Sequence, residues 1–163
     1  MVLQHQKSSM TMIVITFLIA FYLSIVPMPE WAEGYRPPWV SLVLLFWCIA
    51  VPDRVGVASG WLVGISLDAL SGVTLGENAL TMAVLAWITL HIYKLLRVFP
   101  IWQQALVILA MLLLQNLLSF WIRSSFDQMP NTWVYWAPPL IGAVIWPWLY
   151  IMMSDVQRRL RVG

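Results

Sequence analysis

The sequence predicts an all-α membrane protein, a bundle of six transmembrane helices with the N- and C-termini in the cytoplasm. Its composition gives the first indication: 61% of the residues are hydrophobic and 10% are charged, whereas soluble proteins average about 45–50% and about 25%. Several apolar runs also approach the roughly 20 residues that span a bilayer. The basic residues gather in alternate connections between these runs. The 163 residues leave room for five or six such helices but not for a soluble domain as well, so we expect a single integral membrane domain from 1 to 163.

The first two expected helices cover residues 11–26 and 39–51. No small-residue cleavage site follows the first run, so we expect a retained helix rather than a cleaved signal peptide. The second run lies between Pro38 and Pro52 and would rise only about 20 Å as a helix, less than the ~30 Å hydrocarbon core. We therefore expect this helix to be tilted, or the bilayer to be thinner around it.

The third expected helix, residues 55–72, carries small or polar residues at intervals of four: Gly56, Gly60, Gly64 and Asp68. A helix turns about 100° per residue, so these four positions share one broad face. A face without side chains lets another helix approach closely, which is how helices associate in lipid. We interpret this segment as the packing axis of the bundle. The sequence leaves open whether the face packs within the bundle or against a second protein.

A break in the helix is expected at the end of this segment. Ser71 and Gly72 close the run, and Gly76 follows. Asp68, just before the break, is the one acid within an expected span, and a charge at mid-bilayer costs roughly 2.5–3.5 kcal/mol. Three roles are open for Asp68. It caps the following turn through the amides of Ser71 or Gly72 or pairs with a neighbouring helix, it contacts a partner or ligand, or it couples to a proton or ion.

The last three expected helices cover residues 78–96, 102–122 and 136–153. The first of them carries His91, which we interpret as interfacial or hydrogen-bonded within the bundle, with a ligand role as the alternative. Gln115 and Ser119, near the end of the next helix, share a face and are expected to hydrogen-bond across helices. The last helix is expected to be interrupted by Pro147.

The distribution of basic residues predicts the orientation. With six helices, both ends of the chain lie on the same side of the membrane. Seven basic residues share that side and two lie on the other: Lys7, Arg54, Lys94, Arg97, Arg158, Arg159 and Arg161, against Arg36 and Arg123. This difference fits the positive-inside rule and places both termini in the cytoplasm. The basic cluster after the last helix suits anchoring next to anionic lipid, with docking of a cytoplasmic partner as an alternative.

The sequence offers no constellation for catalysis or metal binding. Cys48 is the single cysteine and has no partner for an internal disulfide. The chain contains no metal-protease, nucleophile-elbow or phosphate-loop motif. Ser71 and His91 could be paired as nucleophile and base, but nothing in their spacing supports it. We therefore expect no enzyme activity, no cofactor, no metal and no nucleic-acid partner.

Three stretches carry a resemblance to a known family: GWLVGISLDALSGVTLGENAL at Gly60–Leu80, WQQAL at Trp102–Leu106 and IWPW at Ile145–Trp148. They resemble the bacterial rod shape-determining membrane protein family MreD, and the resemblance extends over nearly the whole chain. It adds Trp146 and Pro147 to the candidate residues for packing or partner contact.

The resemblance implies a non-enzymatic scaffold or adaptor subunit of the elongasome in the bacterial inner membrane, needed for rod cell shape and lateral-wall peptidoglycan synthesis. It implies contact with MreC, a bitopic periplasmic scaffold. Through MreC it implies a link to the actin-like MreB, a SEDS glycosyltransferase and a class B penicillin-binding transpeptidase. The family is also distantly similar to the six-helix substrate-binding subunits of energy-coupling-factor transporters.

We hypothesise that the Gly56–Gly64 face, or the short helix beside it, receives the transmembrane helix of MreC. Asp68 and the turn from Ser71 to Gly76 would shape the outer end of that contact. The alternative is a carrier of a small molecule or lipid, with a pocket that opens outward near Asp68. A third class, an intramembrane enzyme, would rest on Ser71, His91 and Asp68.

Overall fold

The structure is a computed structural model that describes residues 2–72, 75–126 and 133–159. Every regular element in these ranges is helical: α1 (Val2–Ile25), α2 (Glu30–Glu33), α3 (Trp39–Ala50), α4 (Val57–Ser71), α5 (Glu77–Val98), α6 (Ile101–Ser125), the 3-10 helix η1 (Trp133–Trp136) and α7 (Ala137–Arg159). The expected all-α fold is confirmed for this part of the chain. Arg161, one of the basic residues expected near the last helix, and Val73 and Thr74 of the expected turn lie outside it.

Six of these helices coincide with the six expected apolar runs, and the differences lie mainly at their ends. α1 begins as early as Val2, α6 continues to Ser125 and α7 to Arg159. The apolar run marks only the part of a helix that suits lipid, whereas backbone hydrogen bonding continues through the polar residues that flank it. The sequence did not predict α2 or η1, which are short helices in the connections.

Pro147 does not interrupt α7, contrary to the expectation from sequence. The helix is continuous from Ala137 to Arg159 with this proline inside it. Prolines are tolerated within membrane helices because neighbouring helices and small local adjustments satisfy the freed backbone groups. Pro138 and Pro139, in contrast, lie in the first turn of α7, where no intrahelical N–H bond is lost.

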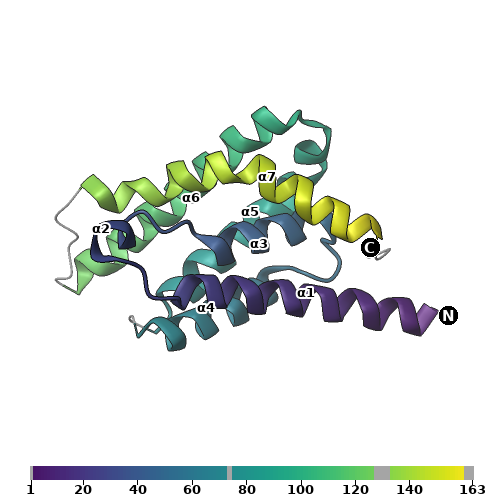
Figure 1. Ribbon diagram of the computed structural model, residues 1–163, viewed down its shortest axis with the longest axis horizontal. Helices are drawn as coiled ribbons and strands as arrows, with labels where there is room; N and C mark the ends of the chain where they lie inside the picture. Colours follow the sequence, from purple (N-terminus) through teal and green to yellow (C-terminus); the bar gives the residue numbers. More distant parts are fainter. Residues whose placement is uncertain (1, 73–74, 127–132, 160–163) are drawn as a thin grey trace.

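The long helices alternate in direction along the bundle. α1 begins and α7 ends at the same end of the bundle, and α2 lies at the opposite end (Figure 1). α4 packs along α5, and α6 packs along α7. α3 contacts α1, α5 and α7, so it lies between the other helices.

α3, rather than α4, is the central helix of the bundle. All residues from Val40 to Ile49 are buried, as expected for a helix that is apolar on every side. This finding corrects the expectation that α4 is the packing axis, whereas the expected tilt of α3, or a thinner bilayer around it, stays a prediction. Because protein surrounds α3 from Val40 to Ile49, its apolar length need not match the thickness of the surrounding lipid.

Polar side chains from neighbouring helices fix α3 in this position. The indole Nε1 of Trp47 donates to Oγ1 of Thr16 on α1, at 2.8 Å. Arg97 of α5 donates to the carbonyls of Ile49 (2.9 Å) and Ala50 (3.1 Å). These two carbonyls end the helix and would otherwise lack partners.

Three of the described helices are long and apolar enough to cross a membrane: Glu77–Val98, Ile101–Ser125 and Trp133–Arg159. Three further apolar helices are shorter: Met10–Ile25, Trp39–Ala50 and Val57–Ser71. These lengths and compositions are typical of the helices of a membrane protein.

Candidate functional site

The glycine face of α4 is covered by α5. A Cβ atom on Gly64 would lie 2.4 Å from Cα of Ala79, and one on Gly60 would lie 2.9 Å from the carbonyl oxygen of Met82. Both contacts are with the backbone of α5, so the two glycines allow the helices to approach more closely than any side chain would. Gly56 is different, because a Cβ there would meet only Cδ1 of Leu90, at 3.5 Å.

Neither surface that the sequence offered to a partner helix is open in the structure. Gly60 and Gly64 face α5 within the bundle. α3, the short helix considered as the alternative, is buried from Val40 to Ile49. The repeat of glycines predicted a close helix contact, and the structure makes that contact inside this chain.

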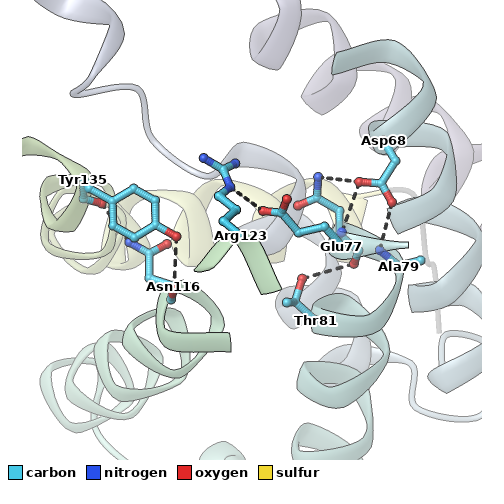
Figure 2. A network of polar contacts seen from close by, with 8 residues as sticks. Asp68, Glu77, Ala79, Thr81, Asn116, Arg123 and Tyr135 are labelled. Carbon is cyan, nitrogen blue, oxygen red and sulfur yellow. Dashed lines mark hydrogen bonds and ion pairs between the residues drawn. The ribbon is translucent and has the colours of Figure 1, made fainter. Parts of the chain in front are cut away.

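Asp68 caps the first turn of α5 from the end of α4 (Figure 2). Its carboxylate accepts hydrogen bonds from the amides of Gly76 (2.9 Å), Asn78 (3.1 Å) and Ala79 (3.4 Å) and from Nδ2 of Asn78 (2.9 Å). Its side chain is buried, so these donors replace water around the charge. The N-terminus of a helix also favours a negative charge.

A cap was among the roles considered for Asp68, but the expected donors were wrong. The amide of Gly72 bonds to the backbone carbonyl of Asp68 instead, at 3.1 Å. The carboxylate reaches the next helix because the chain turns back through two glycines with positive φ, Gly72 (68°) and Gly76 (101°). Residues with a Cβ rarely adopt this conformation. Asp68 therefore fixes the α4–α5 hairpin, and α4 ends at Ser71.

A polar pocket lies next to this cap, at the same end of the bundle as α2. Its volume is about 180 Å³. It is lined by the ends or starts of five helices and by η1: Ser24, Pro38, Trp39, Val40, Ser41, Leu67, Glu77, Asn78, Met82, Gln115, Asn116, Ser119, Arg123 and Tyr135. We refer to this site below as the polar pocket.

An ion pair forms one wall of the polar pocket. Nε of Arg123, on α6, lies 2.9 Å from Oε1 of Glu77, the first residue of α5 (Figure 2). Glu77 is 3% exposed and Arg123 is 33% exposed. The sequence placed Glu77 in a connection and gave it no role. Its partner lies 46 residues away, and no local pattern links the two.

Asn116 and Tyr135 hold η1 against α6 on the other side of Arg123. Nδ2 of Asn116 donates to the carbonyl of Tyr135 (2.9 Å), and the Tyr135 hydroxyl donates to the carbonyl of Asn116 (3.1 Å). The guanidinium carbon of Arg123 lies 5.8 Å from the centre of the Tyr135 ring, within the range of a cation–π contact. The sequence gave no role to Tyr135.

Two buried side chains of the polar pocket have no hydrogen-bond partner among the described residues. Gln115 is 9% exposed and Ser41 is 2% exposed, and both line the pocket. The sequence predicted that Gln115 and Ser119 bond across helices; both are buried here, but Gln115 forms no such bond within the described ranges. Nε of Arg36 is the one side-chain N or O atom in the described ranges that is fully buried without a partner, so the polar atoms of Gln115 and Ser41 remain accessible from the pocket and can bond to an additional polar occupant.

The other candidate residues lie outside the polar pocket. Trp146 is buried and donates from Nε1 to Oε1 of Gln104, at 3.4 Å, while Pro147 lies within α7. His91 is exposed, and its Nδ1 lies 2.7 Å from the carbonyl of Trp87 on its own helix. Cys48 is buried and unpaired. No group of three metal-ligating side chains occurs in the described ranges.

The chain is similar to known proteins over most of its length. The family model described as "rod shape-determining protein MreD" matches residues 4–156. The rod shape-determining protein MreD of Haemophilus influenzae is 30% identical over 146 residues, which is 90% of this chain and 90% of that protein. No solved structure matches the chain.

Proposed function

Because the chain belongs to the rod shape-determining protein MreD family, we propose that it is a non-enzymatic membrane scaffold of the elongasome, needed for rod shape and lateral-wall peptidoglycan synthesis. The family match across residues 4–156 carries this proposal and supports the role in cell shape. The scaffold acts through contact with MreC. Through MreC it is linked to MreB, a SEDS glycosyltransferase and a class B penicillin-binding transpeptidase.

The proposed protein is a single domain that crosses the inner membrane six times. The shared end of α1 and α7 supports this topology (Figure 1). The basic residues agree with it: Arg54 follows α3, and Arg97 and Arg159 lie at the ends of α5 and α7. By the positive-inside rule that end is cytoplasmic. The polar pocket then opens toward the periplasm.

We assign the contact with MreC to the polar pocket instead of the glycine face. α5 covers Gly60 and Gly64, whereas Gln115 and Ser41 line the pocket and form no hydrogen bond with the described residues. A bitopic periplasmic scaffold leaves the membrane at the level of this pocket. Polar groups from its membrane-proximal segment would satisfy Gln115 and Ser41 and would meet Arg123.

Co-purification with MreC from mild detergent tests this assignment. Gln115→Leu removes the donor and acceptor from the pocket at similar volume. We expect the recovery of MreC to fall about tenfold or more relative to the unmodified chain, because each lost hydrogen bond contributes about 1 kcal/mol. Cells that depend on this variant are expected to widen and lose rod shape. Gln103→Leu is the matched control, since it makes the same change on α6 outside the pocket.

Full recovery of MreC with Gln115→Leu, in cells of normal width, would exclude the polar pocket as the contact. Normal rods after depletion of the whole chain would exclude the scaffold role itself. Turnover of a substrate by the purified protein would contradict the non-enzymatic assignment.

A second candidate function is a carrier for a small polar molecule. The observation that favours it is the pocket volume of about 180 Å³, more than the ~150 Å³ that accommodates benzene in an engineered cavity. Glu77 and Arg123 both line the pocket and their charges cancel, so the pocket suits a polar ligand without net charge. A ligand that co-purifies with the protein, or a metabolite that raises its melting temperature, would support the carrier over the scaffold.

A further inference from the structure

A second polar pocket lies at the opposite end of the bundle, where α3 and α5 end. Its volume is about 230 Å³. Phe46, Ile49 and Ala50 of α3 form its apolar wall. Its polar wall consists of Arg97 on α5 and of Tyr150, Ser154 and Gln157 on α7. We refer to it as the Arg97 pocket.

The guanidinium of Arg97 is held in place without being neutralised. It donates from Nε to the carbonyl of Ile49 and from Nη2 to that of Ala50. Its central carbon lies 5.0 Å from the centre of the Tyr93 ring. These partners carry no net charge, and no carboxylate is among the described residues that line the pocket. The pocket therefore has a net positive charge.

Three side chains of α7 face Arg97 and have no hydrogen-bond partner among the described residues. Tyr150, Ser154 and Gln157 follow at spacings of four and three, so they share one face of the helix. They offer two hydroxyl groups and an amide beside an ordered guanidinium. Arginine with neutral donors around it is a typical arrangement for binding phosphate oxygens.

We propose that the Arg97 pocket binds a phosphate group, and that its occupant is the headgroup of an anionic phospholipid. The neighbouring apolar wall of Phe46 and Ile49 suits the glycerol and upper acyl part of a lipid better than a soluble phosphate compound. Basic pockets between helices on the cytoplasmic side of membrane proteins bind such headgroups. The choice of leaflet rests on the proposed topology, which places this end in the cytoplasm.

The test measures which lipid remains bound to the full purified chain. The protein is incubated with mixed micelles of equal phosphatidylglycerol and phosphatidylcholine, and the retained lipid is counted by native mass spectrometry. We expect a roughly fivefold preference for phosphatidylglycerol, the equivalent of about 1 kcal/mol for one arginine. Excess inorganic phosphate in the wash is expected to leave this preference in place.

The test variant is Gln157→Glu, which puts a carboxylate beside Arg97 but leaves the Arg97 contacts with α3 intact. We expect it to abolish the preference. Gln103→Glu is the matched control, because it adds the same charge at the start of α6, near the same end and outside the pocket. It should retain the preference of the unmodified chain.

Equal retention of the two lipids by the unmodified chain would overturn the proposal, as would an unchanged preference in Gln157→Glu. Displacement of the lipid by inorganic phosphate would overturn the lipid as occupant and assign the site to a soluble phosphate compound. The measurement needs no MreC, so its failure is distinguishable from failure of the proposed scaffold function.

Discussion

The missing side chain of Gly64 determines how closely α4 and α5 approach. A methyl group there would lie 2.4 Å from Cα and 2.5 Å from N of Ala79, and neither backbone atom can move away alone. We expect Gly64→Ala to lower the free energy of unfolding by about 1–3 kcal/mol, as overpacking does, despite the better helix propensity of alanine. Gly56→Ala is the control, since its methyl group would meet only the side chain of Leu90 at an ordinary distance.

Cys48 provides the measurement for this comparison. It is the single cysteine of the chain and is fully buried in α3, so a fluorogenic thiol reagent reacts with it only on unfolding. A melting temperature of Gly64→Ala equal to that of Gly56→Ala would contradict the close contact between the two helices.

Asp68 gives the second prediction at the scale of single residues. Asp68→Ala leaves the amides of Gly76, Asn78 and Ala79 without an acceptor, and we expect a loss of at least about 1.5–3 kcal/mol, the contribution of a single bond to a charged group. Asp68→Asn keeps one acceptor oxygen and should lose less. The exposed Asp53→Asn serves as control. The same thiol assay checks the order, and equal melting temperatures for all three would rule out a role in capping.

Sequence reasoning at single residues succeeded where the signal was local. The spacing of Gly60 and Gly64 predicted a close helix contact, and the glycines after Ser71 predicted the helix end. The sequence could not identify α5 as the partner, because a bare face fits any helix. It also missed Glu77, whose partner Arg123 comes from another helix 46 residues later.

At the scale of elements, α3 should be the helix least tolerant of truncation. Leu44 is fully buried within the bundle, whereas Leu62 on α4 is 60% exposed at the surface. We expect Leu44→Ala to cost about 2 kcal/mol or more through the cavity that it leaves. Leu62→Ala should cost little, because lipid fills the vacated space. Thermal unfolding in detergent measures both, and equal losses would contradict the central position of α3.

The apolar runs predicted which segments are helical, because hydropathy and helix length follow from local composition. They did not predict how the helices are arranged. The short run at residues 39–51 suggested a helix that is short for the bilayer, and the neighbouring helices bury α3 from Val40 to Ile49. Its mostly apolar composition was the available signal, since a helix that is apolar on all sides suits a protein interior as well as lipid.

At the scale of the whole molecule, the alternation of helices predicts that both termini lie in the cytoplasm. A fluorescent protein fused after Gly163 should fluoresce, and alkaline phosphatase fused there should be inactive. Alkaline phosphatase inserted after Glu33, in the α2 connection, should be active. An active phosphatase after Gly163 would exclude a six-span bundle in this orientation.

The polar pocket and the Arg97 pocket differ in how far residues that are close together in the sequence could indicate them. The alternative of a carrier, considered from sequence, placed a pocket near Asp68, and Leu67 next to it lines the polar pocket. It gave no indication of the Arg97 pocket, because three helices that are far apart in the chain supply its walls. Arg97 entered the sequence analysis only as one positive charge in a topological count.

The enclosure of α3 also constrains the order of biogenesis. This helix leaves the ribosome before α5 exists, although α5 supplies the guanidinium that closes its C-terminal end. At about 18 Å it is a poor substrate for lateral release from the translocon as an independent span. We therefore expect α3 to reach its final place only after residue 97 has been synthesised, and chains truncated before that point to be degraded faster than the full chain.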